Sequence, residues 1–243
     1  MDSAFLLWAA EMARRQAGGR LVALTAVSDA VPAFDRDDAI QFSTQLEVRH
    51  IVRQSAETEL PDYARNDRDR CFHCKSELFR MAQATADELG MRWLAYGYTA
   101  SDRGDIRPGH RAAADWDVMS PLADAELTKD DIRTLMRAYG LPLSEKPASP
   151  CLSSRIMTGI SITQRRLKDV HEIEDILRQA GVRVYRVRIC GHEDQLFLRI
   201  EVAQEEMPKV LELRDTLVTE AQARGYQWAT LDLGGYRTGG GTA

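Results

Sequence analysis

Cys151 lies in a stretch, Lys146 to Arg155 (KPASPCLSSR), whose residue types suit sulfur chemistry. Prolines at positions 147 and 150 fix φ and remove two N–H donors, so neither a helix nor a strand can run through it. We expect an ordered loop that presents the thiol. The two hydroxyls and the guanidinium that follow Cys151 are groups that lower the pKa of a thiol and stabilise a thiolate. An inert cysteine in a small polar loop is the alternative interpretation.

Cys71 and Cys74 form a second thiol group, in Arg70 to Lys75 (RCFHCK). Apolar positions recur at helical spacing from Cys71 to Leu89, which predicts a helix with both cysteines on one face of its first turn. Free N–H groups and the positive end of the helix dipole favour thiolates there. The spacing also matches the ligands of zinc and iron–sulfur sites, with a chance pair as the alternative. Together with Cys151, the pair suggests a three-cysteine site.

Composition limits the class of protein. The chain has 243 residues, 44% of them hydrophobic, and a net charge of −5, so no global basic surface favours non-specific nucleic-acid binding. Four cysteines in this length do not make a disulfide scaffold. The Cys71-x-x-Cys74 spacing, with no export signal expected, indicates metal or redox chemistry in a reducing compartment. The apolar run at residues 5–10 continues into Glu11, Arg14 and Arg15, which predicts an amphipathic helix rather than a signal peptide. No run reaches the ~20 apolar residues of a membrane span. We expect a cytoplasmic protein.

The first part of the chain predicts an α/β domain over residues 1–158. Asp2 and Ser3 read as the N-cap of a helix that ends at Gly18 and Gly19. The further elements expected are strands at 21–27, 48–52 and 93–98 and helices at 35–46, 71–89 and 129–139. Parallel sheets of this kind normally begin with a strand and a phosphate-binding turn. Here the pattern begins on a helix.

Residues 159–243 predict a small α+β domain. Helices are expected at 164–180 and 208–224, and strands at 182–189, 196–202 and 227–233. The strand at 182–189 carries Arg186 and Arg188, which are candidate ligands for a phosphate or carboxylate, with a solvated strand face as the alternative.

Polar residues follow the expected strand at 93–98. Loops at the carboxyl ends of parallel strands form the ligand crevice of open α/β sheets. Asp102 and Asp105 could hold Mg²⁺ or a ribose, and Arg107 could pair with a phosphate or carboxylate. A surface Asp-Gly turn is the alternative.

The order of these motifs resembles the ATP-dependent sacrificial sulfur transferases (LarE) of the PP-loop ATP pyrophosphatase group. The matching stretches cover nearly the whole chain and are RCxxCK at 70–75, GYT at 97–99, Asp102 to Gly109, SPL at 120–122, LTK at 127–129, KPA at 146–148, CLSSR at 151–155 and LDL at 231–233. The resemblance implies a Rossmann-like PP-loop domain with a parallel sheet, followed by a small α+β domain, and a homo-oligomer.

The resemblance also implies the reaction. Family members use Mg-ATP to adenylate a carboxylate of a pyridinium dicarboxylate mononucleotide, release pyrophosphate, and pass on sulfur to give a thiocarboxylate for the nickel-pincer nucleotide of lactate racemase. Cys151 matches the sulfur-bearing cysteine. Cys71 and Cys74 match two cysteines that, in one branch, join it to hold a [4Fe-4S] cluster that carries an extra sulfide, which implies a sulfide donor as a partner. That implies a catalytic rather than a sacrificial cysteine.

Other site residues follow from the same match. Arg155, Arg186 and Arg188 are implied as ligands of substrate phosphate or carboxylate, and Glu174 and Glu201 as acidic site residues. The implied residues of the ATP and Mg²⁺ site are Asp2, Ser3, Asp102, Asp105, Arg107 and Lys129.

One departure concerns the PP-loop, which reads Ser-Gly-Gly-x-Asp-Ser in the family, whereas this chain opens Met1-Asp2-Ser3. The glycines and the strand before them would cradle the pyrophosphate of ATP. We expect that Met1 replaces the variable residue and that the coding region continues upstream through Ser-Gly-Gly.

Two other functions stay open. One is a PP-loop thiolase that acts on tRNA, which the acidic composition disfavours. The other is a degenerate homologue in which Cys71, Cys74 and Cys151, with His73 or Cys190, hold a structural Zn²⁺. Metal content separates these alternatives from a catalytic cluster.

Overall fold

The computed structural model describes residues 1–103, 108–146, 150–192 and 194–237. They form two compact units. Unit 1 contains Met1–Ser28, Ala33–Glu57 and Asp69–Ser149, and unit 2 contains Asp29–Pro32, Thr58–Arg68 and Pro150–Ala243. The predicted Asp105 and Arg107 lie outside the described residues. The boundary of independently folding domains after residue 158 stays a prediction.

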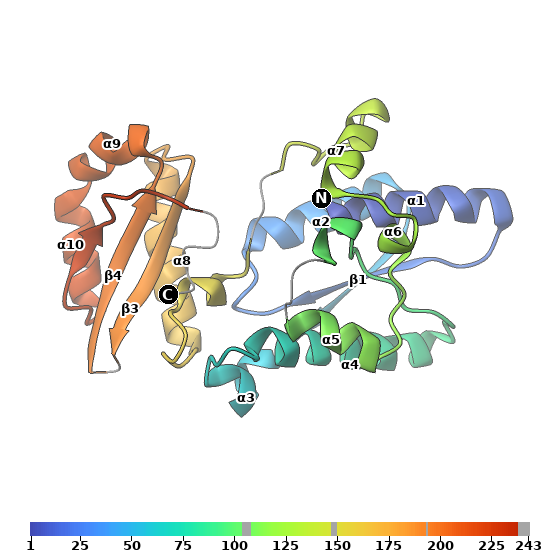
Figure 1. Ribbon diagram of the computed structural model, residues 1–243, viewed down its shortest axis with the longest axis horizontal. Helices are drawn as coiled ribbons and strands as arrows, with labels where there is room; N and C mark the ends of the chain where they lie inside the picture. Colours follow the sequence, from blue (N-terminus) through green and yellow to red (C-terminus); the bar gives the residue numbers. More distant parts are fainter. Residues whose placement is uncertain (104–107, 147–149, 193, 238–243) are drawn as a thin grey trace. The chain divides into compact units, whose positions relative to one another are not determined.

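Unit 1 is an α/β unit around a parallel strand pair (Figure 1). The strands are β1 (Val22–Val27) and β2 (Arg49–Gln54), and they pair in register from Val22 opposite Arg49 to Val27 opposite Gln54. Its helices are α1 (Asp2–Ala17), α2 (Ala33–Gln45), α4 (Arg70–Leu89), α5 (Pro108–Asp115), α6 (Pro121–Asp124) and α7 (Lys129–Ala138). The predicted α/β class with a parallel sheet is confirmed.

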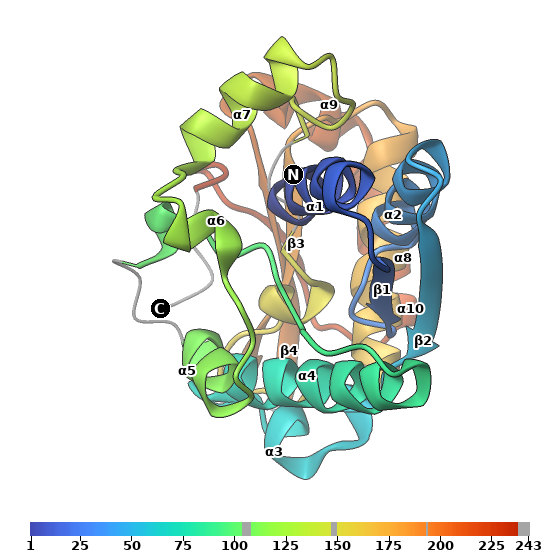
Figure 2. The same cartoon turned by 90° about the vertical axis from the view of Figure 1, so that its right-hand side faces the viewer.

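Local sequence explains where the longer helices of unit 1 begin and end. Helix α4 ends where Gly90 takes the left-handed conformation, with φ 59°, which costs glycine little. Helix α7 begins with a capping box, in which Thr128 and Asp131 each bond the other's backbone N–H. Helix α5 runs beside α4 in both views (Figures 1 and 2). A Cβ at Gly109 would lie 3.3 Å from the carbonyl oxygen of Cys71, so a glycine there lets α5 approach the turn that carries the cysteine pair.

Two local predictions for unit 1 are wrong. Helix α1 begins at Asp2, with Met1 in the cap position and no side-chain cap bond, so Asp2 is helical rather than the N-cap. The strand predicted at 93–98 is reduced to one parallel bridge between Ala95 and Met119. The amide of Tyr98 bonds the carbonyl of Tyr96, so the chain turns before a ladder can form.

Unit 2 is built on a three-stranded sheet with the order β3-β4-β5. Strands β3 (Tyr185–His192) and β4 (Gln195–Val202) are antiparallel, and β5 (Ala229–Leu231) runs parallel to β4. The helices are α3 (Pro61–Ala64), α8 (Gln164–Gln179), α9 (Met207–Glu212) and α10 (Arg214–Ala223), with a 3-10 turn η3 at Leu152–Arg155. This mixed sheet confirms the predicted α+β module, although the single helix expected at 208–224 is divided at Leu213.

The two faces of this sheet differ in polarity. Val187 pairs with Ile200 and Ile189 with Leu198, and all four side chains are buried. On the other face Arg188 pairs with Arg199, and Arg186 pairs with Glu201. Because side chains alternate along a strand, one face forms the core and the other concentrates charge.

His50 links the strands of unit 1 to helix α2. Its Nδ1 lies 2.8 Å from Ser43 Oγ, and its Nε2 lies 2.9 Å from Thr25 Oγ1. The Ser43 hydroxyl is 2.9 Å from the carbonyls of Ala39 and Ile40 and donates to them, so it accepts from Nδ1–H and leaves Nε2 to accept from Thr25. Burial lowers the pKa of His50 below its usual 6.5.

We predict a loss of stability on mild acidification that depends on His50. The unfolded chain takes up the proton near pH 6.5 and the folded chain only at lower pH, so the free energy of unfolding falls as the pH drops below 6.5. In urea denaturation at pH 7.5 and 5.5, His50→Gln should show a smaller difference between the two pH values than the parent. His171→Gln, on α8, is the control and should keep the parent difference. An unchanged difference in His50→Gln would contradict the prediction.

Candidate active site

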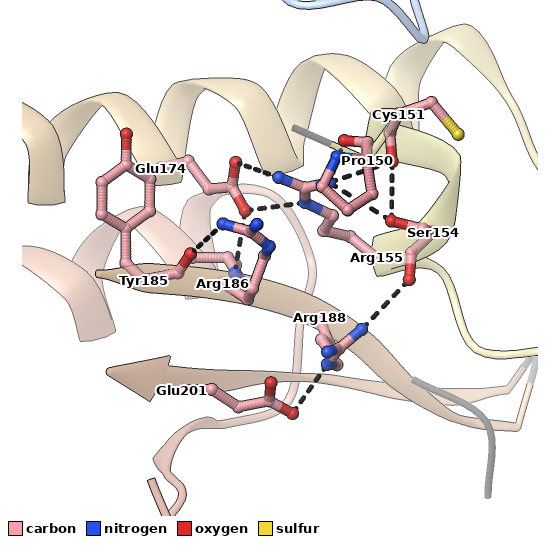
Figure 3. A network of polar contacts seen from close by, with 10 residues as sticks. Pro150, Cys151, Ser154, Arg155, Glu174, Tyr185, Arg186, Arg188 and Glu201 are labelled. Carbon is pink, nitrogen blue, oxygen red and sulfur yellow. Dashed lines mark hydrogen bonds and ion pairs between the residues drawn. The ribbon is translucent and has the colours of Figure 1, made fainter. Parts of the chain in front are cut away.

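The segment that begins at Cys151 is held by its main chain (Figure 3). Cys151 immediately precedes η3, where Leu152, Ser153 and Arg155 are buried. The carbonyl oxygen of Cys151 accepts from the Ser154 hydroxyl at 2.7 Å and from Arg155 Nη1 at 3.0 Å. The Cys151 thiol is half-buried, and Figure 3 shows its sulfur pointing away from the Arg155 guanidinium. From the sequence we expected these donors to stabilise the Cys151 sulfur. In the structure they bond the Cys151 carbonyl oxygen and fix the backbone instead.

Arg155 and Glu174 form a buried ion pair beside this segment. Arg155 Nε lies 3.0 Å from Glu174 Oε1, and the side chains are 4% and 9% exposed. The same Oε1 accepts from the backbone N–H of Val187 at 3.1 Å. Arg155 also donates to the carbonyl of Pro150. One carboxylate therefore links α8, strand β3 and the Cys151 segment.

A second buried pair joins Arg188 to Glu201. Arg188 Nε lies 2.6 Å from Glu201 Oε1, and its Nη1 donates to the carbonyl of Ser154 at 3.1 Å. Arg188 is only 7% exposed, so the alternative of a solvated strand face is wrong for this residue. Arg199 shares the same Glu201 oxygen at 2.8 Å. Among the described residues, the other oxygen of Glu201 is buried without a hydrogen-bond partner.

Arg186 lies on the same sheet face as Arg188. Its guanidinium donates to the carbonyl of Tyr185 and lies 5.1 Å from the centre of the Tyr236 ring. Burial, reinforced by the positive charge of Arg155, lowers the pKa of Arg186. Guanidinium groups this close repel one another, and a bound anion offsets that repulsion. The arrangement can therefore bind a phosphate or a carboxylate.

Sequence reasoning missed Arg199. It stands directly opposite Arg188 in the antiparallel register, and its Nε lies 3.7 Å from Asp232 Oδ2. The signal was present, since β4 alternates Phe197, Arg199 and Glu201 with apolar residues. The register that brings Arg199 to Arg188 could not be read from either strand alone.

In unit 1 the structure brings Asp102 and Lys129 together. Lys129 Nζ lies 2.6 Å from Asp102 Oδ1, and the other Asp102 oxygen accepts from the Thr99 hydroxyl at 2.8 Å. Burial raises the pKa of Asp102, but the hydrogen bonds from Lys129 and Thr99 outweigh it and leave this pKa lowered. These hydrogen bonds thus favour the charged form of Asp102 and hold its carboxylate in the loop that follows the Ala95 bridge.

Asp2 belongs to the same neighbourhood. Burial raises its pKa, while the charges of the Met1 amino group and Lys129 act in the opposite direction. Within the part of the chain that the structure describes, its buried Oδ1 has no hydrogen-bond partner. A Cβ on Gly97 would lie 2.7 Å from the backbone nitrogen of Ser3, so only glycine allows the chain to pass the start of α1. An anionic oxygen without a donor beside Lys129 and Asp102 suits a metal ion.

The cysteine pair lies on the first turns of α4, as expected. Cys71 is exposed, and the half-buried Cys74 donates from Sγ to Glu57 at 3.4 Å. The buried Glu57 also accepts from Ser28, which follows β1, and from Ser55, which follows β2. Sequence reasoning missed Glu57. Its position just past β2 was the available signal, since loops after parallel strands form the ligand edge.

The structure describes all four cysteines, and none forms a disulfide. Cys71 and Cys74 belong to unit 1 and Cys151 to unit 2, so a joint site of the three stays a prediction. Within the described ranges, no group of three or more His, Cys, Asp or Glu side chains is placed to hold a metal ion. Nor does any described helix have the length and apolar character to cross a membrane.

Comparisons with known proteins identify relatives that match most of the chain. No family model matches it. The uncharacterized protein slr1717 of Synechocystis is 36% identical over 224 residues, which is 91% of this chain and 82% of that protein. Pyridinium-3,5-bisthiocarboxylic acid mononucleotide synthase of Lactiplantibacillus plantarum is 31% identical over 72% of this chain. The uncharacterized protein MJ0830 of Methanocaldococcus jannaschii is 25% identical over the same share.

The last two alignments span 62% and 66% of those relatives' own lengths. Among solved structures, the U34-tRNA thiolase NcsA from Methanococcus maripaludis with its [4Fe-4S] cluster matches with a TM-score of 0.45 and 14% identity. That match covers 73% of this chain and 63% of the thiolase. The chain belongs to a LarE-like protein family.

We predict that the Arg155–Glu174 pair stabilises unit 2. Arg155→Met leaves a buried carboxylate without its cation and frees two carbonyls, which should lower the free energy of unfolding by about 3–5 kcal/mol. Urea denaturation measures the loss. The double variant Arg155→Met/Glu174→Gln should recover part of it, because the orphaned charge is gone.

The control is Arg178→Met. Arg178 forms a 3.0 Å ion pair with Asp175 on the exposed side of the same helix, so its removal should change stability little. Equal losses of unfolding free energy in Arg155→Met and Arg178→Met would show that the buried pair stabilises the protein no more than the exposed pair does.

Proposed function

We propose that this chain is an ATP-dependent sulfur transferase that converts a carboxylate of a pyridinium dicarboxylate mononucleotide into a thiocarboxylate, in the biosynthesis of a nickel-pincer nucleotide. The support is family membership, the similarity to the L. plantarum synthase, and one structural observation. A half-buried cysteine is held by its backbone within a cluster of buried arginines, so that a thiol and an anion-binding surface occur in the same unit.

The reaction has two steps. A substrate carboxylate oxygen attacks the α-phosphorus of ATP, and the bond to pyrophosphate breaks. A sulfide sulfur from the sulfide donor would then attack the acyl carbon of the adenylate, and AMP would leave with the electron pair of the C–O bond, which leaves the thiocarboxylate. Adenylation is needed because a carboxylate is a poor electrophile and AMP is a good leaving group.

Each group of residues has a role in this scheme. Asp2 and Asp102 supply the carboxylate oxygens that Mg²⁺ prefers, Ser3 adds a hydroxyl, and Lys129 offsets the charge on the phosphates. Arg155, Arg186 and Arg188 orient the anionic substrate. Arg155 also fixes the Cys151 carbonyl and Arg188 the Ser154 carbonyl, while Glu174 holds Arg155 in place and Glu201 holds Arg188. The predicted roles of Asp105 and Arg107 in the nucleotide site remain part of this proposal.

We further propose that Cys71, Cys74 and Cys151 hold a [4Fe-4S] cluster. The donor set fits, because the three side chains are thiols outside disulfides, two of them one helical turn apart. The chain connectivity allows it too, since three residues separate Asn66 from α4, and Asn66 bonds the carbonyl of Ile156, five residues after Cys151. When bound, such a cluster supplies one iron with an open position for sulfide.

The remaining features are proposals of the same kind. A sulfide donor would reload the site, the protein would work as a homo-oligomer in the cytoplasm, and neither a nucleic acid nor a membrane would be a partner.

Metal analysis after anaerobic purification tests the cluster. We predict about four irons per chain with matching sulfide, and loss of the iron in Cys71→Ala and in Cys151→Ala. Cys190→Ala is the control, since the buried Cys190 lies on β3 and is outside the proposed ligand set. One zinc per chain without iron would overturn the cluster and favour a structural zinc site.

Thiocarboxylate formation from ATP and the pyridinium substrate tests the reaction itself. Cys151→Ser should abolish the product while ATP–pyrophosphate exchange continues, because adenylation does not use the thiol. Sulfur transfer to tRNA in place of the mononucleotide would contradict the proposed substrate.

A further inference from the structure

Tyr63 is a buried residue that touches the Cys151 segment without taking part in the proposed reaction. It lies on α3, is 1% exposed, and its hydroxyl forms a hydrogen bond with Ser153 Oγ. Ser153 is fully buried and stands two residues after Cys151. A buried hydroxyl pair of this kind fixes the position of the backbone that carries it.

Asn66 extends the same contact. Its side-chain nitrogen lies 3.2 Å from the carbonyl oxygen of Ile156, 2.9 Å from that of Met157 and 2.8 Å from that of Ile160. Its φ of 58° is left-handed, a conformation that asparagine tolerates better than most residues. Asparagine thus satisfies both a backbone and a hydrogen-bonding requirement at this position.

The main chain adds two further hydrogen bonds. The carbonyl of Asn66 accepts from the amide of Gly159 at 3.2 Å, and that of Ala64 accepts from Ile162 at 2.7 Å. Residues 153–162 are therefore docked on residues 63–66 over their whole length, on contacts that involve neither Arg155 nor Arg188.

We propose that Tyr63 and Asn66 are positioning residues for sulfur transfer, which set the placement of Cys151 by holding the backbone that follows it. This inference rests on the proposed function. Three residues after residues 63–66, the chain enters α4, which carries Cys71 and Cys74. The short segment 63–66 thus precedes the cysteine pair and also binds the residues that follow Cys151. Tyr63 acts through the Ser153 hydroxyl, and Asn66 acts through the carbonyls of residues 156, 157 and 160.

The test compares two buried tyrosine hydroxyls of unit 2. Tyr63→Phe keeps the ring and removes the bond to Ser153. Tyr226→Phe is the matched control, because the Tyr226 hydroxyl donates to Asp169 at 2.9 Å and its ring is buried as well. Alkylation of Cys151 by iodoacetamide in the full chain, read by peptide mass spectrometry, reports on the placement of the thiol.

We expect Tyr63→Phe to raise the alkylation rate of Cys151 about fivefold, the factor that corresponds to one lost hydrogen bond of about 1 kcal/mol. Ser153→Ala should also raise the rate, and the double variant should show less than the sum of the two single effects, because both changes remove the same hydrogen bond. In turnover, thiocarboxylate formed per ATP consumed should fall in Tyr63→Phe and stay at the parent level in Tyr226→Phe.

Two outcomes would overturn the inference. One is an alkylation rate in Tyr63→Phe equal to that in Tyr226→Phe at similar melting temperatures, which would leave Tyr63 a structural residue only. The other is full additivity of the two single variants. If the parent protein forms no thiocarboxylate, the proposed function fails, whereas the alkylation comparison still decides the positioning role.

Discussion

The buried ion pair between Arg155 and Glu174 is the interaction on which the rest of the candidate site depends. A guanidinium has five N–H donors in a fixed planar fork, so Arg155 can bond a carboxylate on one side and two carbonyl oxygens on the other. Glu174 extends the connection to the Val187 amide. A lysine has the charge but not the geometry for this arrangement. The result is a cysteine whose backbone is fixed while its sulfur points away from the Arg155 guanidinium (Figure 3).

The polar face of the unit 2 sheet shows how local charge can oppose the overall charge. The chain has a net charge of −5, yet this face places Arg186, Arg188 and Arg199 against two carboxylates, Glu201 and Asp232. Two arginines share one oxygen of Glu201, so the pairing leaves positive charge to be offset by an anion. The net charge argues against a broad surface for binding nucleic acid. It does not exclude a local site for one small anion.

The sequence predicted the elements well where local patterns decide them. Helices with clear periodicity, such as α4 and α7, were predicted, and so were the parallel pair and the strands of the C-terminal α+β module. The prediction was wrong for Trp93 to Tyr98, because an apolar run does not reveal the turn that leaves a single bridge. Site partners such as Arg199, Glu57 and Asn66 were missed, since register and the packing of distant segments decide them.

The path of the chain also limits what a linear domain boundary can mean. Unit 2 contains Asp29–Pro32, directly before α2, and Thr58–Arg68, directly before the segment that enters α4. These pieces carry the Ala30 carbonyl that accepts from Leu152, together with the buried Tyr63 and Asn66. A cut after residue 158 would separate Asn66 from the Ile160 carbonyl and Ala64 from the Ile162 amide, and would leave these donors and acceptors without partners. The Cys151 segment therefore depends on contacts from residues far before it in the sequence.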